Sequence, residues 1–193
     1  RGWAPRACIG WGSRAAVQTE QRVRGYYAAD QIARRGREMG GERAKDVQGQ
    51  RPRVVGVLKG ACMFQCDRAR ATPLPDLEMD FLAVASYGSG THSSGKVQLI
   101  MDLRSDITDR TVVLCEGVVD SGLSVRFILD LLESRGARSI KVATLLDKAP
   151  CRRIPVPIDY KGWTIGAEFV IGYGMDADEK ERNLPYVGGL EEA

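Results

Sequence analysis

The chain has 193 residues, of which 44% are hydrophobic and 27% charged, and its formal net charge is +3. This length and composition are typical of one globular domain with a substantial core. No apolar run approaches the ~18 residues of a membrane-spanning helix, so we expect no membrane partner. The charge is uneven, since residues 1–53 hold 12 Lys and Arg against 5 Asp and Glu. We expect the basic residues of this region to form a solvated helix face, and contact with nucleic acid is the alternative.

The first 19 residues contain three Arg and no acid, and they lack the apolar core of a secretory signal. This composition fits a disordered tail, a cloning remnant or the remnant of an organelle transit segment. We therefore separate residues 1–19 from a single domain over residues 20–193. We expect a cytoplasmic protein, and import into an organelle remains open.

Strands and helices are expected to alternate along the domain. A helix-leaning pattern covers about residues 17–39, and a helix ending near Ala71 follows a β-rich run at residues 53–58. Strand-like runs occupy residues 77–84, 96–101, 112–116 and 139–146, and an apolar-periodic helix opens at Ser124. This alternation indicates a mostly parallel sheet with helices on both faces.

Polar side chains follow the expected strands where parallel sheets bind their ligands, beyond the carboxyl ends. They are Lys59, Glu116, Asp120, Asp147 and Lys148. Because these ends meet at one edge of the sheet, we expect the five side chains to converge on a crevice that binds an anion.

The segment 112–124 carries the clearest functional signal. Its apolar strand ends at Glu116, and a turn of an acid, a hydroxyl and a glycine (Asp120, Ser121 and Gly122) then opens a helix at Leu123 and Ser124. Free backbone N–H groups and the helix dipole favour a phosphate there, and a plain helix N-cap is the alternative. Acids do not bind phosphate, so we expect them to hold a metal ion or ribose hydroxyls. The loop therefore predicts a phosphorylated sugar or nucleotide.

Residues 86–95, beginning with Ser86 and Tyr87, contain three Gly and four Ser. Such a segment is either a loose connection or a lid that closes over a substrate. We expect His92 within it to be an exposed loop residue and not a general base.

Five segments together resemble the type I phosphoribosyltransferase family, in its hypoxanthine-guanine branch. They read VVGVLKGACMF, MDFLAVASYGSGTHSSG, VVLCEGVVDSGLS, ATLLDK and EFVIGYGMDADEKERNLPYVGGL, in that order between residues 54 and 190. The resemblance implies a core over about residues 53–150. It also implies a small hood built from the N-terminal helix and about residues 160–190.

The resemblance further implies the reaction of purine salvage. Ribose 5-phosphate passes from phosphoribosyl pyrophosphate to N9 of hypoxanthine or guanine, which gives IMP or GMP and releases pyrophosphate. Mg²⁺ is the implied cofactor, and a homodimer or homotetramer is the implied assembly.

Roles near the ribose and the leaving group carry over by position. Asp120 through Ser124 hold the 5-phosphate, and Asp120 also acts as general acid/base near N7 of the purine. Glu116 contacts the ribose hydroxyls. The pyrophosphate contacts are Lys59, Gly60 and Arg182, and the Leu58–Lys59 peptide is often cis in this family.

Roles around the purine carry over in the same way. Lys148 donates to O6, Phe169 stacks on the ring, and the Val170 backbone reads its edge. Asp176 lies in the same region and, with Glu116, is implied in binding the metal. Ser86 and Tyr87 belong to the implied lid.

One departure from the family pattern falls inside the phosphate segment. Gly117 stands where the family normally has Asp beside the preceding Glu. The missing carboxylate would hold a ribose hydroxyl, so we expect weaker or less precise binding of phosphoribosyl pyrophosphate. Gly117 therefore supports one alternative, a weakly active or non-catalytic nucleotide-binding paralogue. A second alternative is an RNA-binding regulator, for which the basic N-terminal region is the only support.

Overall fold

The computed structural model describes residues 23–47, 49–87 and 96–190, with backbone alone at residues 43–45, 86, 87 and 96. Its elements in chain order are β1 (Val23–Tyr27), α1 (Ala29–Asp46), β2 (Arg53–Leu58), α2 (Cys62–Ala71), β3 (Glu78–Tyr87), β4 (Lys96–Met101), β5 (Thr111–Val119), α3 (Leu123–Ser134), β6 (Ser139–Asp147), the 3-10 turn η1 (Ala149–Cys151), β7 (Tyr160–Thr164) and β8 (Val187–Leu190). None of the described helices is long and apolar enough to cross a membrane.

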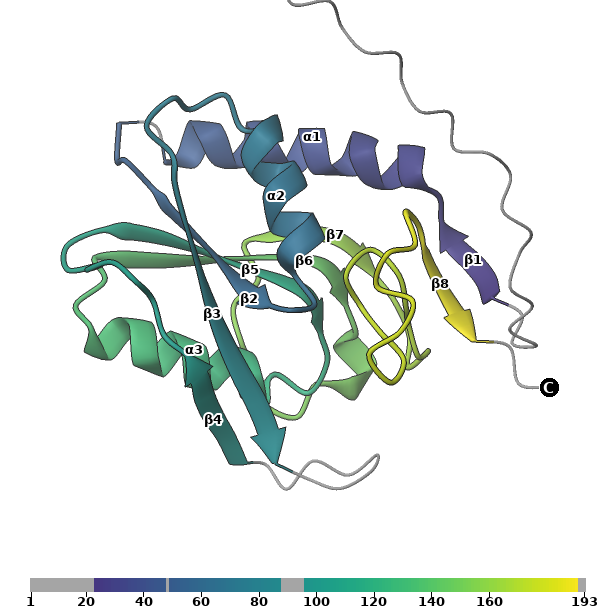
Figure 1. Ribbon diagram of the computed structural model, residues 1–193. Coiled ribbons are helices and arrows are strands. Elements are labelled where there is room, and N and C mark those ends of the chain that lie inside the picture. The colour runs from purple at the N-terminus through teal and green to yellow at the C-terminus, as the bar shows by residue number, and fades with distance from the viewer. Residues whose placement is uncertain (1–22, 48, 88–95, 191–193) are drawn as a thin grey trace, which may run out of the picture.

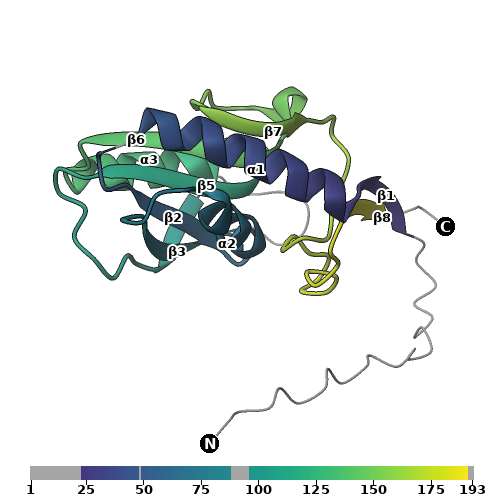
Figure 2. The same ribbon diagram turned by 90° about the horizontal axis from the view of Figure 1, so that it is seen from above.

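A six-stranded sheet with the order β4-β3-β2-β5-β6-β7 forms the centre of the domain. All neighbouring strands run parallel except β3 and β4, which are antiparallel. Helices α1 and α2 lie over one face, and α3 lies over the other (Figures 1 and 2). The mostly parallel sheet with helices on both faces is confirmed.

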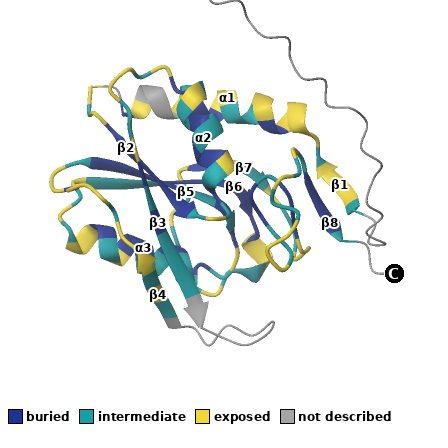
Figure 3. Ribbon diagram, viewed as in Figure 1, coloured by how far each residue is buried: buried dark blue, intermediate teal, exposed yellow. Residues whose placement is uncertain are grey.

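The core consists of two apolar clusters, one on each face of the sheet. In one cluster, which includes Phe64 and Leu145, helices α1 and α2 pack on the sheet. In the other, which includes Ile128 and Leu132, helix α3 packs on the opposite face. The central strand β5 is buried along most of its length, which explains its continuous apolar run (Figure 3). The sheet thus fixes the carboxyl ends of β2, β5 and β6 at one edge.

The terminal regions pair with each other outside the main sheet. Strand β1 runs antiparallel to β8, with Val23 opposite Leu190, so the expected hood is a small two-stranded sheet. The helix expected over about residues 17–39 is partly wrong, because residues 23–27 form this strand and α1 continues to Asp46. A pairing partner more than 150 residues away leaves no trace in a local pattern.

Helix α2 carries two buried polar side chains that join it to its neighbours. The Gln65 amide donates to the carbonyl oxygens of Val54 and Asp80, both at 2.9 Å. Arg68 packs its guanidinium over the ring of Phe64, 5.2 Å from the centroid. Gln65 thus ties α2 to β2 and β3, and Arg68 joins it to α1 through the carbonyl oxygen of Met39 at 3.3 Å.

Candidate active site

An open cleft of about 750 Å³ lies beyond the carboxyl ends of β2, β5 and β6. Its far wall is the segment that follows β7. The cleft brings together eight residues named from the sequence: Lys59, Gly60, Asp120, Lys148, Phe169, Val170, Asp176 and Arg182. These side chains come from four separate stretches of chain, so the fold assembles them at one site.

A smaller cleft of about 230 Å³ adjoins the first and contains the predicted phosphate loop. It is lined by Glu116 and by Asp120, Ser121, Gly122 and Ser124. Asp120 lines both clefts, so a ligand that fills them places this carboxylate between its two parts. A phosphate in the small cleft would face the first turn of α3, where the backbone N–H groups lack intrahelical partners and the helix dipole is positive.

Gly122 is the residue that lets this loop turn into α3. Its φ is +88°, in the left-handed region that favours glycine, and it precedes Leu123 at the start of the helix. A Cβ atom there would lie 2.4 Å from the carbonyl oxygen of Ile154. Segment 152–154 therefore packs directly against the loop, and glycine is the only residue that fits.

Arg152 supports the loop from behind, and sequence reasoning missed it. Its Nε donates to the carbonyl oxygen of Asp120 at 2.9 Å, and its Nη2 lies 3.3 Å from that of Val119. The same guanidinium pairs with the buried carboxylate of Asp147 at 2.5 Å, which Lys161 also contacts at 3.1 Å. Asp147 therefore does not face the cleft as expected, and it anchors the supporting arginine.

Asp120 and Lys148 form the pair at the middle of the main cleft. The Lys148 ammonium lies 3.5 Å from Oδ2 of Asp120. The lysine side chain is only 8% exposed, whereas the aspartate is 55% exposed. The lysine is therefore fixed and the aspartate is free to reach a ligand. The backbone N–H of Lys148 also donates to the carbonyl of Val119 at 2.9 Å, which ties the ends of β5 and β6 together.

Glu116 and Gly117 lie near the carboxyl end of strand β5, which points toward the site. Burial raises the pKa of the Glu116 carboxyl to about 8, and its Oε1 accepts a hydrogen bond from the Gly117 N–H at 3.0 Å. Gly117 is buried, and a Cβ atom on it would lie 3.0 Å from the carbonyl oxygen of Gly60. The position that lacks a carboxylate is thus closely packed against the loop after β2.

That loop begins with a cis peptide between Leu58 and Lys59, as the resemblance implies. The Lys59 ammonium pairs with the Glu179 carboxylate at 2.6 Å. Arg182 pairs with Asp176 at 2.8 Å and with Glu179 at 3.3 Å. Lys59 and Arg182, which are expected to bind pyrophosphate, and Asp176, which is expected to bind the metal, thus belong to one ionic network.

Asp176 lines the large cleft and Glu116 lines the small one, and the resemblance implies these two carboxylates as the metal ligands. No group of three or more His, Cys, Asp or Glu side chains converges in the described part of the chain. Mg²⁺ is commonly bound by one or two carboxylates together with waters and substrate phosphates. The donor set therefore fits Mg²⁺ bound jointly with a phosphorylated ligand, and it does not fit a closed protein site.

The segment around Phe169 forms the wall that would meet a purine. Phe169 is 57% exposed at the cleft, and Val170 is buried behind it. The hydroxyl of Tyr173 donates to Asp67 at 2.5 Å, which fastens this segment to α2. An exposed phenyl ring on a fixed backbone is suited to stacking on a flat base.

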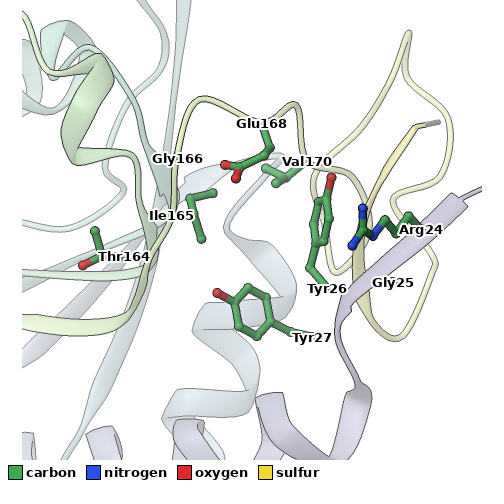
Figure 4. A pocket seen from close by; sticks show the side chains of 9 residues that line it. All are labelled: Arg24, Gly25, Tyr26, Tyr27, Thr164, Ile165, Gly166, Glu168 and Val170. Atoms are coloured by element: carbon green, nitrogen blue, oxygen red, sulfur yellow. The ribbon is translucent and has the colours of Figure 1, made fainter. Parts of the chain in front are cut away.

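Beside this wall, β1 and residues 164–170 border a third cavity, of about 500 Å³. Figure 4 shows Tyr26 on β1 reaching toward the loop that carries Glu168 and Val170. Tyr27 stacks on Trp163 with ring centroids 4.2 Å apart. Gly188 of β8 exchanges backbone hydrogen bonds with Ile171 at 2.8 and 3.0 Å, so the hood backs the segment around Phe169. This contribution of β1 was not foreseen.

The predicted lid is only partly within the described residues. Ser86 and Tyr87 are the last residues of β3, where their backbone pairs with β4. Residues 88–95, with His92, lie outside the described part. The lid therefore stays a prediction.

Comparison with known proteins identifies the family. The phosphoribosyl transferase domain family matches residues 23–178. The hypoxanthine-guanine phosphoribosyltransferase of Bacillus subtilis (strain 168) is 40% identical over 164 residues, which cover 85% of this chain and 91% of that protein. The bifunctional protein TilS/HprT of Listeria monocytogenes serotype 4b (strain F2365) is 44% identical over 84% of this chain, which spans 25% of that longer protein.

A solved structure agrees with both. The crystal structure of a hypoxanthine phosphoribosyltransferase from Staphylococcus aureus superposes with a TM-score of 0.82 at 39% identity, covering 86% of this chain and 90% of that one. With its α/β sheet, its terminal hood and its assembled cleft, this chain belongs to the hypoxanthine-guanine phosphoribosyltransferases of the phosphoribosyl transferase domain family.

Proposed function

We propose that this chain transfers the 5-phosphoribosyl group of phosphoribosyl pyrophosphate to N9 of hypoxanthine or guanine and releases pyrophosphate. The observation that carries the proposal is the joint placement of the phosphate loop, Lys148 and the Lys59–Arg182 cations around adjoining clefts. Each group suits a different part of the substrates. The 5-phosphate belongs in the small cleft, and the base and the pyrophosphate belong in the large one.

Asp120 is suited to moving the purine proton. It lines both clefts and is half exposed, so its carboxylate can reach the base while the adjoining loop holds the phosphate. A proton leaves the purine as the bond from N9 to C1′ forms and the bond from C1′ to pyrophosphate breaks. Asp120 accepts that proton at N7 in the proposed reaction.

Lys148 is suited to selecting the base. Its buried ammonium donates hydrogen bonds only, so it pairs with an O6 acceptor and leaves a 6-amino group unpaired. Phe169 supplies the stacking surface beside it. This pair accounts for a preference for 6-oxopurines over adenine.

Lys59 and Arg182 are suited to the leaving group, where negative charge grows as the bond to pyrophosphate breaks. Asp176 and Glu116 would hold Mg²⁺, which supplies further charge stabilisation at the pyrophosphate and ribose oxygens. Closure of the predicted lid around Ser86 and Tyr87 would exclude water from the cationic ribose.

Gly117 supports a second candidate, a nucleotide-binding paralogue with little turnover. Pyrophosphate release from phosphoribosyl pyrophosphate with guanine and Mg²⁺ separates the two. We expect turnover in the native chain. Turnover that appears only in Gly117→Asp would establish the second candidate. The homodimer or homotetramer remains a prediction that sedimentation would test.

A further inference from the structure

Glu179 occupies the position between the two cations expected to bind pyrophosphate. One carboxylate oxygen lies 2.6 Å from Nζ of Lys59, and the other lies 3.3 Å from Nη2 of Arg182. All three residues line the main cleft. A single carboxylate thus contacts both cations when no ligand is bound, and Asp176 pairs with Arg182 as well.

The backbone holds Glu179 at this place. Its N–H donates to Oδ2 of Asp176 at 2.8 Å, and its φ of +65° lies in the left-handed region. The neighbouring Asp178 also has a positive φ, of +51°. The turn therefore directs the side chain of Glu179 toward the cleft, while the adjacent Asp178 side chain is 95% exposed.

The ionic contacts of Glu179 are of the kind that a ligand can replace. The side chains of Lys59 and Glu179 are each 65% exposed, and pairs this exposed have low stability in water. Pyrophosphate presents the same acceptor atoms as a carboxylate but carries more negative charge. It can therefore take over both cations, provided that the carboxylate moves aside.

We propose that Glu179 is an internal competitor for pyrophosphate, which sets the affinity of the site for the leaving group. The proposal rests on the proposed function, because it takes Lys59 and Arg182 as the pyrophosphate cations. In the resting site the carboxylate pairs with these cations, and after the reaction it returns to them as pyrophosphate departs. Glu179 therefore weakens retention of the product and favours its release, a step that often limits turnover.

Titration of inorganic pyrophosphate in the presence of Mg²⁺, followed by calorimetry, tests this directly. We expect Glu179→Gln to bind pyrophosphate about two- to fivefold more tightly than the native chain, because the competing charge is removed from Lys59 and from Arg182, which keeps its pair with Asp176. Asp178→Asn is the matched control. It removes the same charge from the neighbouring residue, which touches neither cation, and it should leave the affinity unchanged.

Three outcomes would overturn the proposal: unchanged affinity in Glu179→Gln, weaker binding in it, or equal tightening in Asp178→Asn. Weaker binding would mean that Glu179 orients Lys59 for the ligand, and equal tightening would mean that only the overall charge matters. A native chain that turns over substrate while showing one of these outcomes contradicts the role of Glu179 alone. Absence of both turnover and pyrophosphate binding in the native chain would contradict the proposed function as well.

Discussion

The backbone of Gly117 lies directly against the carbonyl oxygen of Gly60, which a Cβ atom on Gly117 would approach to 3.0 Å. The carboxyl end of β5 and the loop after β2 are therefore in direct contact. A side chain at position 117 affects both: it can offer a group to the ribose, and it must also displace the loop by a few tenths of an ångström. The family resemblance alone shows only the first effect.

Substitution of Gly117 should separate these two effects. We expect Gly117→Ala to raise the KM for phosphoribosyl pyrophosphate about threefold, because its Cβ displaces the loop that carries Lys59. Gly117→Asp should lower that KM about tenfold, since one charge-assisted hydrogen bond to the ribose contributes ~1.5–3 kcal/mol. Steady-state kinetics with each substrate varied in turn measures both, and the KM for guanine should not change.

Gly36→Ala is the control for this pair, since a Cβ atom there meets nothing within 4 Å. It should leave both KM values at the native level. Identical KM values for the Ala and Asp variants at position 117 would show that the missing carboxylate has no part in binding the ribose.

The stability of the ligand-free protein should depend on the ionisation of Glu116. Burial raises the pKa of this carboxyl from 4.5 to about 8, so the folded chain keeps a proton that the unfolded chain releases. The free energy of unfolding therefore falls as pH rises from about 4.5 to about 8, and it levels off above that range. In the native chain we expect this decline to amount to ~1–3 kcal/mol, because the Glu116 side chain keeps some exposure to solvent. Glu116→Gln should lack the decline.

Urea unfolding without Mg²⁺ at about pH 5 and about pH 8.5 measures this difference. The native chain should lose stability relative to Glu116→Gln between the two conditions. A constant difference between the two proteins would show that Glu116 ionises normally in the fold.

Arg152 should act on catalysis through the loop that it supports. Arg152→Gln leaves the buried carboxylate of Asp147 with Lys161 alone and removes the donors to two loop carbonyls. We expect the free energy of unfolding to fall by ~2–3 kcal/mol and kcat to fall about tenfold to hundredfold, because Asp120 loses its position.

Arg153→Gln is the matched control, since this neighbouring arginine is exposed. It should change neither kcat nor stability. If Arg152→Gln lowers stability but leaves kcat intact, Arg152 supports the fold without positioning Asp120.

Replacement of Lys148 should affect the two substrates unequally. The ammonium is buried at the large cleft, where the base is proposed to bind, and Lys148 does not line the phosphate cleft. We expect Lys148→Ala to raise the KM for guanine about a hundredfold, because a buried O6 would lose its charged donor. The KM for phosphoribosyl pyrophosphate should change less than threefold, and equal losses for the two substrates would remove Lys148 from the purine site.

Much of the main sheet followed from local pattern. The apolar run of β5 and the turn at Asp120 to Gly122 predicted a strand, a phosphate loop and the start of α3, because each signal lies within a few adjacent residues. The ends of β2, β5 and β6 then placed Lys59, Asp120 and Lys148 on one edge, where the structure has them.

Contacts between distant segments could not be predicted from the sequence. Pairing of β1 with β8 turned an expected helical stretch into a strand. The position of Arg152 behind Asp120 depends on how the segment after β6 folds back. Asp147 was expected in the crevice, yet its side chain is buried against Arg152 and Lys161, because the side chains of neighbouring residues on a strand point to opposite faces.

Asp120 is proposed to move the purine proton in a phosphoribosyl transfer. The most direct measurement is release of pyrophosphate from phosphoribosyl pyrophosphate with guanine and Mg²⁺, for the native chain and for Asp120→Asn. We expect steady release by the native chain. In the variant we expect a loss of about a hundredfold or more in kcat, with binding of phosphoribosyl pyrophosphate retained. No release by the native chain, or unchanged kcat in Asp120→Asn, would contradict it.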